Sequence, residues 1–190
     1  MTSTLPKKPD PQHDAGAPAR KPPAFVMVGL PGSGKSTWAK GYPGKFPVAS
    51  TDAFIEEYAA EKKISYGKAF KKYYKTAVKK MKAQVDGYIK NKTAFIWDQT
   101  NLQHSERDAI YDLLSPTHSV HFVCMIIPLE ICIFQHTLRR VRGGRDGGDV
   151  VDERRIIELA KTATFPVKGD KADKIVRIIH PKWVKKKKPA

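Results

Sequence analysis

Short apolar runs alternate with longer amphipathic segments along most of this chain. The runs are rich in β-branched and aromatic residues, as expected of buried parallel strands, and lie at residues 24–28, 46–50, 93–98, 119–127 and 174–180. Helices are expected from Ser105 onward and over residues 36–40, 53–62, 65–90, 128–141 and 152–163. This alternation predicts an α/β fold with a parallel, doubly wound sheet. The last run alternates most in polarity, so we expect it at a sheet edge.

The longest amphipathic segment, residues 65–90, carries two stripes. Apolar residues recur at spacings of three and four, which is typical of a buried helix face, at Tyr66, Phe70, Tyr73 or Tyr74, Ala77, Met81, Val85 and Tyr88. Lysines recur with the same period, at Lys68, Lys72, Lys75, Lys79 and Lys82. We expect most of the tyrosines to lie in the core rather than to stack on nucleic-acid bases.

The lysine stripe has almost no negative charge near it. Residues 62–92 contain eleven lysines and one acid, Asp86. Solvated helix faces usually mix signs, and like charges on one face repel each other unless an anion neutralises them. We therefore favour a contact with a phosphate backbone over a merely solvated face, and the candidate contacts are Lys68, Lys72, Lys75 and Lys79.

The net charge of the whole chain supports a polyanion partner. The chain has 190 residues and a formal charge of +16, more than an enzyme acting on a neutral metabolite needs. A highly charged solubilising surface is the alternative. We expect the partner to be nucleic acid, with DNA favoured over RNA.

Length and composition are those of one globular domain. A chain with 41% hydrophobic residues can enclose a single core, and no apolar run approaches the roughly 20 residues of a membrane span. The N-terminus lacks the apolar segment of a secretory signal. Cys124 and Cys132 lie in or near apolar segments and are expected to be buried, reduced thiols. We therefore expect a cytoplasmic protein that does not contact membranes.

The two ends differ in composition from the rest. Residues 1–23 contain six prolines, four basic residues and few large apolar residues, which predicts a disordered basic arm. Residues 181–190 form a basic tail with five lysines. The folded domain is expected to span residues 24–180.

The turn after the first apolar run fits the phosphate-loop pattern G-x-x-x-x-G-K-[ST]. Glycines let backbone N–H groups approach phosphate oxygens, Lys35 can reach the β/γ-phosphates, and Ser36 can hold Mg²⁺. The motif lies between an expected strand and an expected helix, as its mechanism requires. It predicts binding of a nucleoside triphosphate by Gly29, Pro31, Gly32, Ser33, Gly34, Lys35, Ser36 and Thr37.

Two aspartates follow expected strands. Asp52 comes just after the second apolar run, and ligands in open α/β sheets bind at the carboxyl ends of strands, so it is expected to face the phosphate loop. Asp98 ends the third run and has the form of a Walker-B carboxylate that helps hold Mg²⁺. The alternatives are a helix cap for Asp52, although Thr51 could cap instead, and an ordinary turn for Asp98.

The segment that begins at Arg139 is rich in arginine and glycine. Four arginines and four glycines within residues 139–148 cannot build a core. Glycines allow hinge motion, and arginines can neutralise the charge that develops on a transferring phosphoryl group. We expect a mobile lid at about residues 139–150, with a flexible exposed loop as the alternative.

Taken together, these motifs resemble those of the polynucleotide-kinase-like P-loop kinases. The resemblance covers about residues 24–180 and rests on Gly29 to Trp38, Asp52, Asp98 to Asn101 and the lid with its following helix. Trp38 and the Asp-Gln-Thr-Asn segment are also similar to the P-loop domain of hnRNP U-type proteins. The family implies a single-domain, three-layer P-loop NTPase fold.

The resemblance implies a catalytic role for four residues. Asp52 would be the general base that takes the proton from an acceptor hydroxyl. Lys35 and the lid arginines Arg142 and Arg145 would stabilise the charge on the β/γ-phosphates.

The same resemblance implies ATP and Mg²⁺ as cofactors. Ser36 and Asp98 would organise the metal ion, and Arg139 would join the phosphate loop in binding ATP. Asn101 would contact the nucleotide or the acceptor.

One position departs from the family. Phage-type 5′-hydroxyl kinases carry an arginine three residues after the base, which grips a phosphate of the acceptor strand, and Ile55 stands there in this chain. The missing arginine and the long lysine stripe are compatible with an internal target, such as the hydroxymethyl group of 5-hydroxymethyluracil in DNA. Such a base would have to leave the stack to reach Asp52. No phosphatase-type Asp-x-Asp-x-Thr segment is present.

Three functions remain open. The leading hypothesis is a kinase for a hydroxyl on nucleic acid. The second is a P-loop kinase of a small molecule such as a nucleoside or sugar, which the charge of +16 disfavours. The third is a non-catalytic module that binds nucleotide and nucleic acid, which Asp52 disfavours because a pure binder needs no base.

Overall fold

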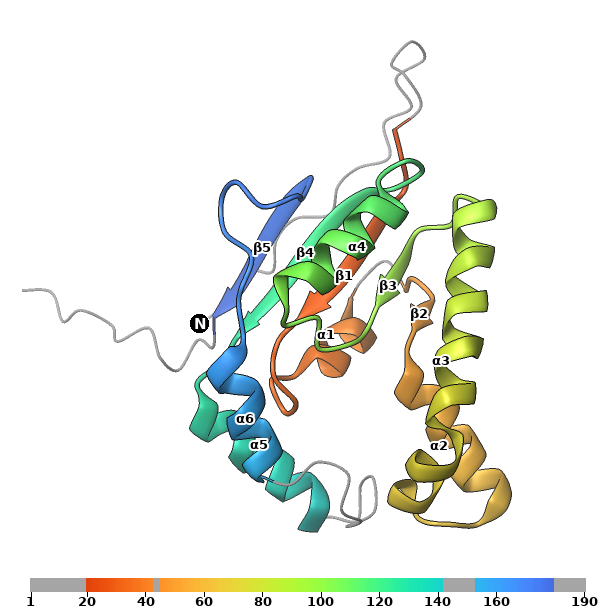
Figure 1. Ribbon diagram of the computed structural model, residues 1–190, viewed down its shortest axis with the longest axis vertical. Coiled ribbons are helices and arrows are strands. Elements are labelled where there is room, and N and C mark those ends of the chain that lie inside the picture. Colours follow the sequence, from red (N-terminus) through yellow and green to blue (C-terminus); the bar gives the residue numbers. More distant parts are fainter. Residues whose placement is uncertain (1–19, 43–44, 142–152, 180–190) are drawn as a thin grey trace, which may run out of the picture.

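The computed structural model describes residues 20–42, 45–141 and 153–179, and these form an α/β domain around a parallel sheet (Figure 1). The strands lie in the order β2-β3-β1-β4-β5, and each neighbouring pair is parallel. They are β1 (Pro23–Val28), β2 (Val48–Ala49), β3 (Phe95–Trp97), β4 (Ser119–Ile126) and β5 (Lys174–Ile179). The helices are α1 (Lys35–Gly41), α2 (Thr51–Lys62), α3 (Tyr66–Lys90), α4 (His104–Leu114), α5 (Leu129–Val141) and α6 (Glu153–Thr162). The predicted doubly wound sheet is confirmed, with β5 at an edge.

Some expectations fall outside the described residues. These are the disorder of residues 1–19, the lid residues 142–150 and the basic tail after residue 180. The second strand is described and is shorter than the expected run at 46–50, because Pro47 has no amide N–H to donate to the ladder.

The central strand β1 is covered on both faces. Val26 packs in the cluster that α3 and α4 cover, whereas Phe25 and Met27 pack in the cluster that α1 covers. In Figure 1, α4 accordingly lies in front of the sheet and α1 behind it. Burial on both faces explains the continuous apolar run in the sequence and gives the three layers of helix, sheet and helix.

Helices α2 and α3 form a hairpin beside β2 and β3 (Figure 1). Ile55, Ala69 and Ala77 form its buried contact. The rings of Tyr58 and Tyr73 stack in parallel, with centroids 4.2 Å apart. Tyr73 is therefore the inward-facing member of the expected tyrosine pair. The expected helix over residues 65–90 is confirmed.

Helices α2 and α4 begin earlier than expected. Ser50 occupies the N-cap position of α2, so Thr51 and Asp52 lie in the first turn and the capping alternative for either is wrong. Because Gln103 and Glu106 form a capping box, α4 begins one residue earlier than predicted.

The two cysteines, Cys124 and Cys132, are buried and free, as expected. Burial raises the pKa of each thiol to about 11, so both are protonated at neutral pH. Within the described ranges, no helix has both the length and the apolar composition needed to cross a membrane.

Candidate active site

The phosphate loop connects β1 to α1 and has a conformation that requires glycine. Gly32 and Gly34 have φ angles of 80° and 92°, in the left-handed region. A Cβ on Gly32 would also lie 2.2 Å from the carbonyl oxygen of Cys132, so the loop packs closely against α5. Gly34 occupies the N-cap position of α1, which places the loop at the positive end of that helix. This geometry suits a phosphate group.

Lys35 is buried beneath this loop. Its Nζ donates hydrogen bonds to the carbonyl oxygens of Gly29 and Leu30, both at 2.9 Å. Burial lowers its pKa to about 8, and the charges of Asp98 and Asp52 partly oppose the shift. The ammonium therefore sits in a poorly solvated place where a phosphate would be a better partner than two neutral carbonyls.

The two predicted carboxylates reach the same end of the sheet as Lys35. Asp98 directly follows β3, and its amide donates to the Ala49 carbonyl at 2.9 Å. Asp52 lies in the first turn of α2, which follows the neighbouring strand β2. Both carboxylates act electrostatically on Lys35, so three charged groups from separate elements converge there. Their catalytic and metal-binding roles stay predictions.

The residues at this end of the sheet fit a nucleotide with its Mg²⁺. The half-buried Ser36 is the second residue of α1, and the half-buried Asp98 directly follows β3. These supply a hydroxyl and a carboxylate oxygen, the ligands that Mg²⁺ prefers. The buried Ser33 hydroxyl, within the loop, has no hydrogen-bond partner. In the part of the chain described, no cluster of three or more His, Cys, Asp or Glu could hold a metal ion, so a Mg²⁺ ion here would need the nucleotide's phosphates as further ligands.

A tyrosine that the sequence pattern assigned to the core reaches Asp52. The hydroxyl of Tyr66, in the first turn of α3, donates to Oδ1 of Asp52 at 2.8 Å. The apolar spacing of α3 gave no sign of this contact. No local motif links the two residues, which lie in different helices.

The loop after β3 is hydrogen-bonded to the phosphate loop and to β1. The Gly29 amide donates to the Thr100 carbonyl at 3.0 Å. The Asn101 side chain is buried, and its Nδ2 donates to the Met27 carbonyl at 2.8 Å. Asn101 thus braces the end of β1, and its expected contact with nucleotide or acceptor stays a prediction.

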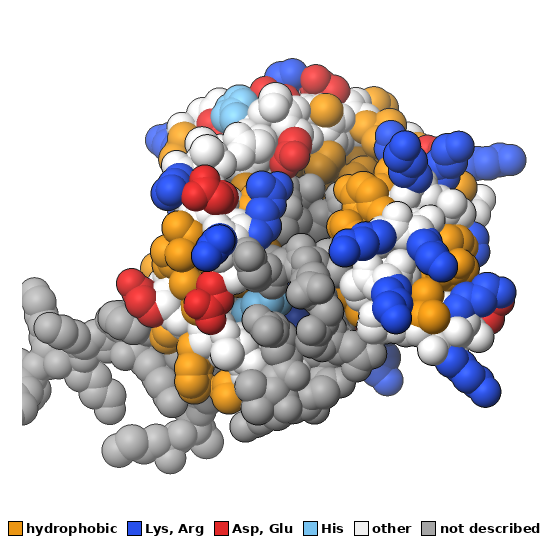
Figure 2. All heavy atoms as spheres, turned by 60° about the horizontal axis from the view of Figure 1, so that its bottom comes forward, with side chains coloured by type: hydrophobic (Ala, Val, Ile, Leu, Met, Phe, Trp, Pro, Cys, Tyr) orange, Lys and Arg blue, Asp and Glu red, His pale blue; other side chains and the backbone are white. Residues whose placement is uncertain are grey.

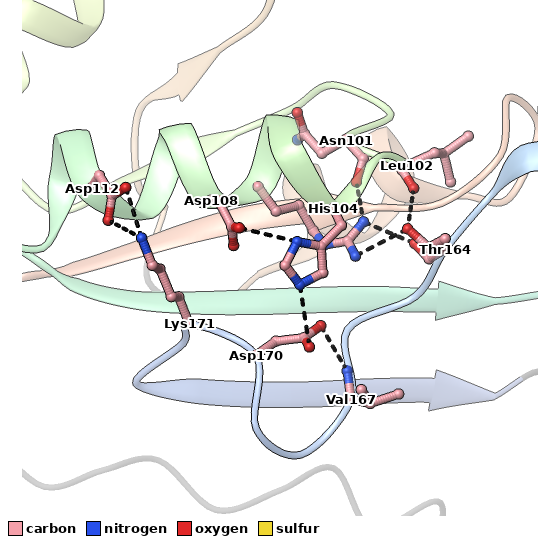
Figure 3. A network of polar contacts seen from close by, with 10 residues as sticks. Asn101, Leu102, His104, Asp108, Asp112, Thr164, Val167, Asp170 and Lys171 are labelled. Carbon is pink, nitrogen blue, oxygen red and sulfur yellow. Dashed lines mark hydrogen bonds and ion pairs between the residues drawn. The ribbon is translucent and has the colours of Figure 1, made fainter.

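A polar network fixes this supporting loop to α4 and to the segment before β5 (Figure 3). The buried Arg107 guanidinium donates to the carbonyls of Asn101 and Thr164, at 3.1 and 2.8 Å. The Thr164 hydroxyl donates in turn to the Leu102 carbonyl at 2.9 Å. Further out, His104 lies 3.0 Å from Asp108. Arg107 was not predicted from the sequence, because its partner Thr164 is remote in the chain.

The predicted lysine face is fully exposed on α3. Lys68, Lys72, Lys75 and Lys79 are all exposed, opposite the buried Ala77 and its apolar stripe, and so is Lys82. Figure 2 shows Lys and Arg side chains gathered on the lobe that α2 and α3 form, whereas the opposite lobe mixes both signs. The lysines of α3 thus form a positively charged face, as predicted from the sequence, and its nucleic-acid partner stays a prediction.

Of the lid arginines, Arg139 lies within the described residues. It is half-buried near the end of α5, and its charge further lowers the pKa of Lys35, which places the two cations near each other. Arg142 and Arg145 lie outside the described residues. The expected lid and its contacts with phosphate are therefore predictions.

Comparisons with known proteins agree with this geometry. The model of the AAA_33 family, described as an AAA domain, matches residues 25–166. A search of curated proteins found no match. Among solved structures, the chain is similar to "a putative kinase from chloroflexus aurantiacus j-10-fl", with 14% identity and a TM-score of 0.65 over 87% of this chain and 92% of that one.

Two further solved structures carry more specific descriptions. A chain of the Pnkp1/Rnl/Hen1 RNA repair complex has 22% identity and a TM-score of 0.61, over 77% of this chain and 45% of that one. A gluconokinase from Sinorhizobium meliloti 1021 has 14% identity and a TM-score of 0.51, over 84% and 83%. These similarities confirm the P-loop kinase fold. Because the family match covers most of the chain, the protein belongs to the AAA_33 family and is a P-loop kinase domain of that type.

Proposed function

We propose that this protein is an ATP- and Mg²⁺-dependent kinase that transfers the γ-phosphate to a hydroxyl on nucleic acid. The acceptor would be a DNA 5′-hydroxyl or a hydroxymethyl base such as 5-hydroxymethyluracil in DNA. The observation that carries the proposal is the position of the lysine face. It lies on α3, the helix whose first turn contacts Asp52. The lysines point away from the apolar stripe that carries Tyr66, so a polyanion held along them would reach this carboxylate only with a part that extends past the start of α3.

Each residue of the site would have a separate role in the reaction. Asp52 would accept the proton of the acceptor hydroxyl as the acceptor oxygen bonds to the γ-phosphorus and ADP leaves. Lys35 would exchange its two carbonyl partners for β/γ-phosphate oxygens. Ser36 and Asp98 would hold Mg²⁺, which neutralises phosphate charge when bound. Charge on the transferring group would also be neutralised by Arg139, Arg142 and Arg145.

A small-molecule acceptor is the second candidate. The similarity to a gluconokinase favours it, since that protein shares the fold over most of both chains. The two candidate functions differ in whether the exposed lysine face of α3 is needed for acceptor binding. A small hydroxylated acceptor needs no exposed lysine face, whereas a polynucleotide does.

Transfer of labelled phosphate from γ-labelled ATP distinguishes these candidates. The acceptors are a 5′-hydroxyl DNA oligonucleotide, the same RNA sequence, duplex DNA with internal hydroxymethyluracil, gluconate and free nucleosides, each tested separately with Mg²⁺. Label on a nucleic acid supports the proposal, and label on gluconate or a nucleoside alone would contradict it. Bound ATP without any transfer would favour the non-catalytic module.

The Asp52→Asn variant tests the base assignment. It should bind ATP normally but lose roughly 10²–10⁴-fold in the rate of transfer, which is the usual contribution of a general base. Turnover near the wild-type value would remove Asp52 from this role.

A further inference from the structure

The contact between Tyr66 and Asp52 joins two helices at the proposed base. Tyr66 lies in the first turn of α3 and Asp52 in the first turn of α2. The phenolic hydroxyl donates to Oδ1 at 2.8 Å, a usual length for an O–H···O hydrogen bond. Both side chains are half-buried, so water competes for this bond less than on an open surface.

The packing of the hairpin does not depend on this hydroxyl. Ile55, Ala69 and Ala77 fill the contact between α2 and α3, and the Tyr58–Tyr73 stack lies against it. The ring of Tyr66 also packs on Phe70, with centroids 6.2 Å apart. Phenylalanine at position 66 would keep this ring contact, so the hydroxyl is the part of the side chain left without a packing role.

We propose that Tyr66 is a positioning residue that holds the Asp52 carboxylate in the orientation in which it accepts the proton of the acceptor. This inference rests on the proposed function. An aspartate has two side-chain torsions, and a hydrogen bond to one oxygen restricts both. Among the described charged groups, Lys35 of the phosphate loop acts electrostatically on Asp52, and Asp98 acts on Lys35. Tyr66 contacts the carboxylate from α3, whereas the charge of Lys35 acts on it from the phosphate loop.

The bond also connects the proposed base to the helix whose opposite face carries the lysines. α3 carries both Tyr66 and the lysine face, and Phe70 and Tyr74 continue the aromatic row along it, with ring centroids 4.8 Å apart. A polyanion that settles on α3 therefore binds the helix that orients Asp52. Positioning residues of this kind change the rate of the chemical step more than they change nucleotide binding, because ATP contacts the phosphate loop.

Two tyrosine variants on the same helix test the proposal. Tyr66→Phe removes the hydroxyl that contacts Asp52, and Tyr73→Phe removes a hydroxyl that faces Lys80 on the hairpin. In the transfer assay with the best acceptor of the panel, Tyr66→Phe should lower kcat about tenfold while the KM and Kd for ATP stay within about twofold. Tyr73→Phe should transfer like the wild type. Wild-type kcat in Tyr66→Phe, or equal losses in both variants, would overturn the proposal.

A double-mutant cycle tests the bond without any acceptor. Urea unfolding is measured for the wild type, Tyr66→Phe, Asp52→Ala and the double variant. If the hydroxyl acts on the carboxylate, Tyr66→Phe should change stability less in the Asp52→Ala background than in the wild type. Fully additive effects would overturn the contact itself.

The results separate this inference from the proposed function. Normal turnover of Asp52→Asn would refute the base and the positioning of that base together. A large loss in Asp52→Asn with none in Tyr66→Phe would refute the positioning role alone. Loss in both, with ATP binding intact, is the result that the proposal predicts.

Discussion

Lys35 and Arg107 are two buried cations that both donate hydrogen bonds to backbone carbonyls. Lys35 bonds the carbonyls of Gly29 and Leu30, which belong to its own loop. Arg107 bonds the carbonyls of Asn101 and Thr164, and the latter is 57 residues away. Lys35 can therefore exchange its carbonyl partners for a ligand without breaking a contact between distant segments. Arg107 cannot, because its hydrogen bonds join such segments.

The difference shows how a buried charge can be functional in one place and structural in another. Burying a charge is costly, and the cost is recovered only by good partners. The ammonium of Lys35 has carbonyl partners and lies within the electrostatic reach of Asp52 and Asp98 at the phosphate loop. A bound phosphate would complete its set of partners. Arg107 already has two carbonyls and the Thr164 hydroxyl as acceptors, and it joins the loop after β3 to the segment after α6.

Replacing Lys35 should produce the largest effect on transfer. Lys35→Met removes the cation that we propose faces the β/γ-phosphates, and transfer should fall by roughly 10²–10³-fold, as when one preorganised donor to a reacting group is lost. The midpoint of urea unfolding should stay the same or rise, because a buried charge is removed. Lys40→Met, an exposed lysine of the same helix, is the control. Transfer within tenfold of the wild type would contradict the functional assignment.

Replacing Arg107 should affect stability instead. Arg107→Met leaves the carbonyls of Asn101 and Thr164 without their buried donor, and the free energy of unfolding should fall by about 2–4 kcal/mol. The Kd for ATP of the folded protein should remain within about twofold. The exposed Arg154→Met variant is the control. A stable Arg107→Met protein with weakened ATP binding would contradict the structural role assigned to Arg107.

The pKa of Lys35 gives a third prediction, on nucleotide affinity. Since burial lowers this pKa to about 8 in the ligand-free protein, the ammonium is lost as the pH rises above 8. ATP affinity should therefore fall by up to about tenfold per pH unit between pH 8.5 and 9.5, if only the charged form binds phosphate well. Calorimetric titration measures this. The Lys35→Met variant should show a flat profile, and a flat profile in the wild type would contradict the assignment.

Replacing exposed lysines of α3 should have the smallest effect per residue, and the effect should be on nucleic-acid binding. The triple variant Lys72→Ala, Lys75→Ala and Lys79→Ala should bind a single-stranded oligonucleotide more weakly, with the slope of log affinity against log salt reduced by about 2. ATP affinity should not change. A control of equal charge replaces Lys161, Lys168 and Lys174, which lie on the other side of the domain. Equal slopes in the two triple variants would show that the lysine face of α3 has no special role.

Features that lie within short segments could be predicted from the sequence. Contacts between distant segments could not. The phosphate loop, the acidic strand ends and the two stripes of α3 are patterns within short segments, so their positions could be read in advance. Tyr66 and Arg107 could not be, because their partners are brought near only by the fold. Tyr66 fitted an apolar stripe, and Arg107 stood between two acids in an expected helix. Arg107 is buried and Tyr66 half-buried, and each makes polar contacts that the periodicity of the sequence does not indicate.

Direct competition between acceptors in one mixture tests the central claim most directly. Wild-type protein, Mg²⁺ and γ-labelled ATP are incubated with equal concentrations of a 5′-hydroxyl oligonucleotide, a duplex with internal hydroxymethyluracil, gluconate and a nucleoside, and the label on each is counted. The ratio of labels gives the ratio of kcat/KM values. Nucleic acid should carry most of the label, and the triple variant at Lys72, Lys75 and Lys79 should lose this preference. Label mainly on gluconate or the nucleoside would contradict the proposed function.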